Sequence, residues 1–203
     1  MSIASLLSHH GVEVPRYVTV DGRIVFDGVH VSDAGVAVHD RLGPVTPVQK
    51  HTFHGGADAG QINTPNAWWD DSAQVRLHRD AMDRSFPGFE YNEGNASHGP
   101  RWTGQIDTGR GRFTLQVELR ADQGLPALRV IGPKLGAFSS GRWVPSPHLY
   151  LSGNLCVADR SEWNPVVHDA ATAVAWGAHW LAAYTEWRMS RRWPIDGVQV
   201  DAA

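Results

Sequence analysis

The only cysteine of this chain, Cys156, is its strongest candidate nucleophile. His148 stands eight residues before it and Asp159 three residues after it. A cysteine paired with a histidine is a common arrangement for nucleophilic catalysis, because the imidazole can take the thiol proton. A lone cysteine is also often a buried core residue, so residue type alone leaves both interpretations open.

Composition limits the classes of protein to which this chain can belong. Hydrophobic residues make up 42% and charged residues 19% of the 203 residues, a globular balance that argues against wholesale disorder. The net charge of −3 gives no sign of nucleic-acid binding. One cysteine excludes an internal disulfide and any zinc site with several thiolates, and we expect no cofactor. No apolar run approaches the ~20 residues of a membrane span, and no leader peptide is evident, so we expect a cytoplasmic protein.

The first 69 residues are predicted to form a β-rich extension. Apolar runs between residues 14 and 38 are separated by Asp21-Gly22 and Asp27-Gly28, and Asp-Gly between such runs is typical of hairpin turns. The following stretch, 43–66, is rich in Gly, Pro, Thr and Asn without a period, and is predicted to be a long loop or linker.

From residue 70 the pattern changes to a helix, a meander and a second helix. Asp70, Asp71 or Ser72 can cap a helix that runs to about Arg84. Strands are expected at 102–107, 112–120 and 128–131, and the middle one alternates strictly, with Phe113, Leu115, Val117 and Leu119 on one face. A long apolar helix is predicted from Asn164 or Pro165 to Arg191, with Trp176 and Trp180 in the core. Segregation of sheet and helices makes the fold class α+β.

The segment around the cysteine carries a motif. It reads Ser146-Pro147-His148-Leu149-Tyr150-Leu151-Ser152-Gly153-Asn154-Leu155-Cys156-Val157, followed by Trp163-Asn164-Pro165. This resembles the active-site segment of ubiquitin-conjugating enzymes, which have His-Pro-Asn, then a glycine and an aliphatic residue before the catalytic cysteine, and Trp-Ser-Pro downstream. The matching positions are Pro147, Leu149, Gly153, Leu155, Cys156, Trp163 and Pro165. Two departures matter, since Ser146 replaces the motif histidine and His148 replaces the motif asparagine.

The resemblance covers about residues 72 to 193 and implies a ubiquitin-conjugating (UBC-like) domain over residues 70–203. The aromatic tail, with Trp180, Trp187 and Trp193, looks similar to the bacterial branch of this family. Members of that branch are encoded beside an activating enzyme and a ubiquitin-like protein, often in antiphage defence loci. The resemblance therefore implies three partners: a ubiquitin-like protein, a ThiF-like activating enzyme and a protein substrate.

The same resemblance suggests roles for the three candidate catalytic residues. Cys156 would carry the acyl group as a thioester. His148 would donate to the oxyanion, act as a base, or only pack the loop, and histidine is suited to both chemical roles by its near-neutral pKa. Asp159 would orient an incoming amine, or would be only a solvated loop charge.

Three functions remain open from the sequence. The first is a cysteine-dependent conjugating enzyme, the second a non-catalytic binding module of the same fold, and the third an unrelated Cys–His hydrolase that uses Cys156 and His148. The conjugating enzyme is favoured, and it predicts that Cys156 is partly exposed on an irregular loop.

Overall fold

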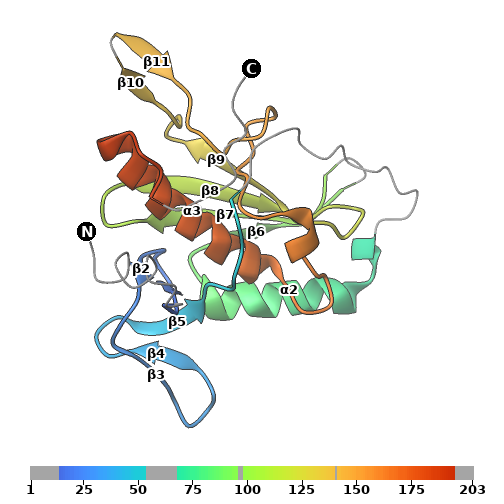
Figure 1. Ribbon diagram of the computed structural model, residues 1–203. Coiled ribbons are helices and arrows are strands. Elements are labelled where there is room, and N and C mark those ends of the chain that lie inside the picture. The colour runs from blue at the N-terminus through green and yellow to red at the C-terminus, as the bar shows by residue number, and fades with distance from the viewer. Residues whose placement is uncertain (1–13, 54–67, 96–97, 140, 195–203) are drawn as a thin grey trace.

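The computed structural model describes residues 14–53, 68–95, 98–139 and 141–194 (Figure 1). Its centre is an antiparallel sheet of four strands in the order β6 (Glu90–Asn92), β7 (Arg101–Asp107), β8 (Arg112–Glu118) and β9 (Ala127–Gly132). The predicted meander is confirmed. The alternating residues of β8 and the residue after it are all buried: Phe113, Leu115, Val117 and Leu119. Strand β6 was not predicted from the sequence.

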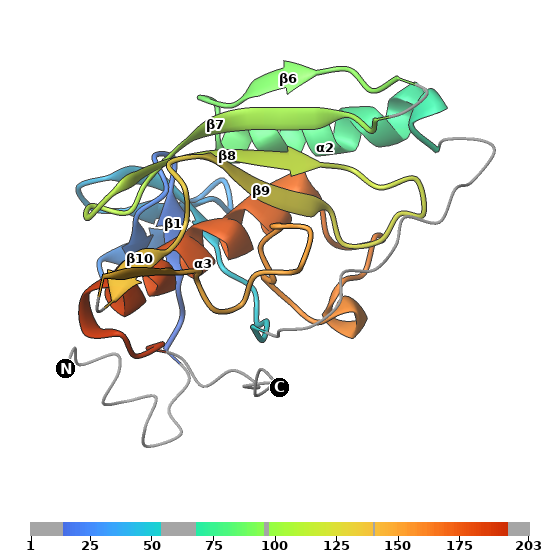
Figure 2. The ribbon, with the colours of Figure 1, turned by 90° about the horizontal axis from the view of Figure 1, so that it is seen from above.

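Two helices pack beneath one face of this sheet, as Figure 2 shows. Helix α2 (Ser72–Ser85) begins as predicted, because the Asp71 side chain accepts a hydrogen bond from the Ala73 N–H. Helix α3 (Ala170–Ser190) begins later than the predicted start at Asn164 or Pro165, so that prediction was wrong. Its start is fixed instead by a capping box between Asp169 and Thr172.

Helix α3 is the centre of the core. Trp176 and Trp180 are both fully buried, as predicted. Gly177 lets the helix lie close to the sheet, since a Cβ there would meet the Leu128 Cδ2 at 2.7 Å and the Leu115 Cδ2 at 3.1 Å. The sequence and structure together give an α+β fold, with a segregated antiparallel sheet and helices.

A second antiparallel sheet is formed by the N-terminal region, in the order β2 (Ile24–Val25), β1 (Tyr17–Thr19), β5 (Gly43–Pro47), β4 (Ala37–His39) and β3 (Val29–Val31). The predicted β-rich character is confirmed. The prediction of an irregular loop from residue 43 was wrong for β5, which pairs with both β1 and β4. Residues 54–66 of that predicted loop lie outside the described residues. The β5 segment forms a strand because it pairs with β1 and β4, whereas its Gly and Pro content had suggested a loop.

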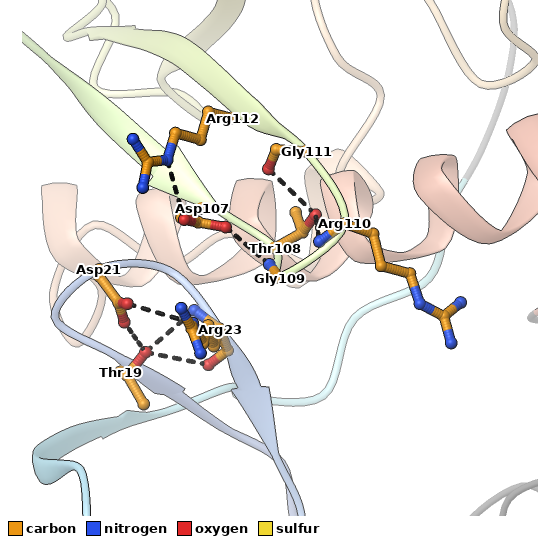
Figure 3. Close-up of polar contacts among 9 residues, drawn as sticks. All are labelled: Thr19, Asp21, Arg23, Asp107, Thr108, Gly109, Arg110, Gly111 and Arg112. Atoms are coloured by element: carbon orange, nitrogen blue, oxygen red, sulfur yellow. Dashed lines mark hydrogen bonds and ion pairs between the residues drawn. The ribbon is translucent and has the colours of Figure 1, made fainter.

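The turn between β1 and β2 lies beside the turn between β7 and β8 (Figure 3). The Asp107 N–H donates to the Asp21 carbonyl at 2.7 Å. Gly22 has a φ of +99°, and a Cβ at this position would lie 2.7 Å from Cγ2 of Ile106. Val18 of β1 is fully buried and belongs to the same core as α3 and β8. The N-terminal sheet is therefore packed against the main sheet and helices.

A hairpin of β10 (Ala137–Ser139) and β11 (Arg142–Val144) projects from the body of the molecule in Figure 1. Its base is anchored on the Tyr184 hydroxyl, which donates to the Gly136 carbonyl and accepts from the Gly136 N–H, both at 3.0 Å. Strand β11 leads directly into the segment that contains His148 and Cys156. Among the described residues, no helix has the length and apolarity needed to cross a membrane.

Candidate active site

The segment between β11 and α3 is irregular apart from a short 3-10 helix, η2 (Arg160–Glu162). A tight turn brings Leu155 back beside Leu149, with which it forms an isolated bridge. Within the turn the Gly153 N–H donates to the Tyr150 carbonyl at 2.9 Å, and the Tyr150 N–H donates to the Asn154 carbonyl at 2.9 Å. Gly153 has a φ of +84°, which explains why this position favours glycine. The turn places Cys156 next to His148.

Cys156 lies on this irregular segment, as predicted, but the expectation that it is partly exposed was wrong. Its exposed fraction is 0%, and the neighbours Leu155, Val157 and Ala158 are also buried. The backbone explains this burial. The Leu155 N–H donates to the Leu128 carbonyl of β9 at 2.8 Å, so this stretch is tied to the edge of the main sheet and its apolar side chains enter the core. A bulky substrate can therefore reach the sulfur only after a local movement.

His148 holds the cysteine segment through its backbone. Its carbonyl accepts hydrogen bonds from the Cys156 N–H at 3.0 Å and from the Trp180 Nε1–H at 3.1 Å. Its φ is +55°, in the left-handed region that only a few residue types enter readily. The side chain is 9% exposed, and its ring lies 4.7 Å from the Trp193 ring and 6.2 Å from the Phe53 ring between centroids.

Asp159 caps η2 three residues after the cysteine. Its Oδ1 accepts from the Ser161 N–H at 2.8 Å and from the Ser161 hydroxyl at 2.6 Å. Glu162 completes a capping box, since its Oε2 accepts from the Asp159 N–H at 2.8 Å. The Asp159 carboxylate is thus bonded to Ser161, and the residue is half-buried at the start of η2.

Glu162 also ties the N-terminal region to this segment. Its carboxylate accepts from the Thr52 N–H at 2.9 Å and from the Thr52 hydroxyl at 2.8 Å, across 110 residues of sequence. Thr52 precedes Phe53, whose ring is 1% exposed and faces His148. The Glu162 carboxylate therefore connects the cap of η2 with Thr52 and, through the chain, with the Phe53 ring that lies beside His148.

Beside Phe53 lies a pair of histidines, the half-buried His51 and the buried His179. The His51 Nε2 and the His179 Nδ1 are 3.0 Å apart, and the His51 Nδ1 is 2.7 Å from the Gln49 carbonyl oxygen. Neutral His51 then carries its proton on Nδ1, and its Nε2 accepts from His179. Burial lowers the pKa of His51 to about 4, and burial followed by the proximity of His51 and Arg16 holds the pKa of His179 well below its usual value. Both rings are neutral near pH 7.

The structure adds three residues to the site that sequence reasoning did not assign to it. Phe53 and Trp193 enclose the His148 ring, and Thr52 binds Glu162. All three are separated from Cys156 by more than 35 residues. Only the aromatic type of Phe53 and Trp193 hints at burial, and no local spacing links them to the cysteine.

Comparisons with known proteins agree with the motif. No curated protein and no solved structure matches the chain. The family model E2-CBASS, described as "Type II CBASS E2 protein", matches residues 78–200, a range that contains Cys156 and all of α3. This match spans more than half of the 203 residues. The chain therefore belongs to the E2-CBASS family, a bacterial ubiquitin-conjugating-like E2 family of antiphage defence.

Proposed function

We propose that Cys156 accepts an acyl group as a thioester and passes it to an amine. The observation that carries this proposal is the family match, which spans the only cysteine of the chain. The order of elements supports a UBC-like fold for the conjugating domain, residues 70–203: helix α2, antiparallel sheet, irregular segment with Cys156, then helix α3. The five-stranded sheet precedes this domain as an N-terminal extension.

The acyl group would be the C-terminus of a ubiquitin-like protein, delivered by a ThiF-like activating enzyme. In the first step the Cys156 thiolate attacks the carbonyl carbon of the incoming thioester, and the thiolate of the activating enzyme leaves. In the second step an amine of a target protein attacks the new thioester. The Cys156 thiolate then leaves, and the amine loses its proton.

His148 and Asp159 are the proposed helpers in the second step. His148 adjoins Cys156 through the backbone hydrogen bond. Its imidazole would donate to the oxyanion or act as a base toward the amine. Asp159, three residues beyond the cysteine, would orient the amine and help to take its proton.

A model substrate tests the thioester without any partner protein. A fluorescein-labelled peptide with a C-terminal mercaptoethanesulfonate thioester is incubated with the chain and analysed on a non-reducing gel. We expect a fluorescent adduct that dithiothreitol removes and that added lysine discharges to a peptide–lysine amide. Cys156→Ser should abolish the reducible adduct with a stability loss of only about 1 kcal/mol, since serine is close in size.

The same gel distinguishes the two alternative functions. A non-catalytic binding module would give no adduct even after prolonged incubation. A Cys–His hydrolase would release the free peptide acid rapidly, with little effect of added lysine on the products. Either result would overturn the proposed transfer function.

A second experiment tests the role of His148, and the backbone conformation of this residue decides which variants to compare. Asparagine tolerates the left-handed conformation that His148 adopts, whereas alanine is strained there. If His148 is an oxyanion donor, His148→Asn should retain much of the discharge rate and His148→Ala should lose about 10²-fold or more. If it is a base, both variants should fail. His148→Gly removes the side chain without the backbone strain, so it separates a chemical loss from a conformational one.

A further inference from the structure

Trp193 lies at the junction of three segments that surround the cysteine. Helix α3 ends at Ser190, and Arg191 follows with a φ of +61° and an N–H that donates to the Trp187 carbonyl at 2.7 Å. This left-handed cap turns the chain, and the Trp193 ring packs back on Trp180 at 5.4 Å between centroids.

The contacts of Trp193 are with the groups that hold the cysteine segment. Its ring lies 4.7 Å from the His148 ring, 5.4 Å from the Trp180 ring and 5.8 Å from the Phe53 ring. The His148 carbonyl accepts the hydrogen bonds of both Cys156 N–H and Trp180 Nε1–H. The Trp193 indole thus packs on the side chains of His148, whose carbonyl holds the Cys156 N–H, and of Trp180, which donates to the same carbonyl.

The packed position of the Trp193 ring, here called its seat, lacks one hydrogen bond. Its indole Nε1 is buried and has no hydrogen-bond partner within the described part of the chain. The indoles of Trp180 and Trp176, by contrast, donate to the His148 and Gln49 carbonyls, each at 3.1 Å. A buried donor without a partner makes the closed arrangement less favourable than a fully satisfied one, so leaving this seat costs less.

We propose that Trp193 is a positioning residue that keeps the segment 146–156 closed over the sulfur, and that Cys156 becomes accessible when Trp193 leaves its seat. This rests on the proposed thioester function, because the fully buried sulfur must be exposed before any acyl donor can reach it. Release of Trp193 frees the His148 ring and loosens the carbonyl that holds the Cys156 N–H. A partner that displaced this indole would then couple its own docking to the loading of the cysteine.

The single thiol of the chain makes the opening measurable. Alkylation by iodoacetamide, followed by intact mass, reports on Cys156 alone. We expect Trp193→Ala to raise the alkylation rate by about tenfold or more, because the truncation removes all three ring contacts. Trp193→Phe should stay within about threefold of the native rate, since a phenyl ring keeps most of these contacts. Trp193→Leu replaces the alanine variant if the latter does not fold.

A matched control separates local opening from general destabilisation. Tyr91 is also half-buried and packs on Trp102 at 5.0 Å, but it lies on the edge strand β6. Tyr91→Ala should leave the alkylation rate near the native value. Low urea should hardly change the rate in Trp193→Ala, because local opening exposes little surface. The proposal is overturned if Trp193→Ala reacts at the native rate, or no faster than Tyr91→Ala.

The labelled peptide thioester distinguishes this proposal from the proposed function. If Trp193 closes the site and the transfer function holds, Trp193→Ala should form the adduct faster than the native chain. If alkylation accelerates but no variant forms an adduct, the closure stands and the transfer function fails. If the adduct forms equally fast in native chain and Trp193→Ala, the transfer function stands and the closure is refuted.

Discussion

Replacement of Glu162 by alanine should separate the N-terminal region from the cysteine segment. The Glu162 carboxylate accepts three hydrogen bonds, from the Thr52 N–H at 2.9 Å, the Thr52 hydroxyl at 2.8 Å and the Asp159 N–H at 2.8 Å. The variant removes all three and leaves two backbone donors without this acceptor. Thr52 also precedes Phe53, so the wall beside His148 should loosen as well.

The expected loss follows from the type of hydrogen bond and its exposure. A hydrogen bond to a charged group contributes about 1.5–3 kcal/mol, and a donor that can reach water recovers part of this. Glu162 is half-buried, so water replaces some of the lost contacts. We therefore expect Glu162→Ala to lower the free energy of unfolding by about 2–4 kcal/mol. Glu162→Gln, which retains one acceptor oxygen, should lose about 1 kcal/mol.

Urea unfolding at pH 7, followed by tryptophan fluorescence, measures this change. Glu186→Ala is the matched control, because Glu186 forms an ion pair with Arg110 whose side chains are 43% and 58% exposed. That variant should lose at most about 0.5–1 kcal/mol. Glu162→Ala should also accelerate alkylation of Cys156. This prediction would be refuted if Glu162→Ala lost no more unfolding free energy than Glu186→Ala and if Cys156 were alkylated at the native rate. The hydrogen bonds between Thr52 and Glu162 would then not support the site.

Two further predictions concern the N-terminal sheet and the histidine pair His51 and His179. Gly22→Ala should lose about 2 kcal/mol in urea unfolding, because it combines a positive φ with a close approach to Ile106. Gly35→Ala, with a φ of +75° and nothing within 4 Å of the added methyl, should lose only about 1 kcal/mol. Equal losses in the two variants would show that the approach to Ile106 costs no stability. The lowered pKa values of His51 and His179 mean that the unfolded chain binds more protons, so their contribution is complete above pH 6.5 and declines as the pH falls. For His51 the decline extends down to its pKa of about 4. For His51 alone this is about 3 kcal/mol, and His51→Phe should show a shallower fall between pH 7 and 4.5 than the native chain.

Much of the fold was accessible from local patterns. The strict alternation from Phe113 to Leu119 predicted β8 and its buried face, because a strand buried on one side needs an apolar residue at every second position. The sequence offered Asp70, Asp71 and Ser72 as caps for the start of α2, and the structure shows that Asp71 is the residue that caps it. The spacing around Gly153 and Cys156 indicated the family, since the turn needs a glycine at one fixed position.

The tertiary structure decided the features that depend on distant partners. Strand β5 forms because β1 and β4 supply its hydrogen bonds, although its own Gly and Pro content suggested a loop. Helix α3 starts at Asp169 and not at Pro165, because Asp169 and Thr172 close a capping box and the preceding residues form turns.

The environment of the cysteine was decided in the same way. Sequence placed Cys156 on an irregular segment, which is correct, and an irregular segment usually lies on the surface. Its burial arises from the Leu128 carbonyl that holds Leu155 and from the His148 carbonyl that holds Cys156 itself. Trp193, which follows helix α3, packs its ring against the His148 ring at 4.7 Å between centroids. Sequence thus determined which residue can carry the chemistry, whereas long-range packing determined that its sulfur is covered, because no local spacing encodes contacts across tens of residues.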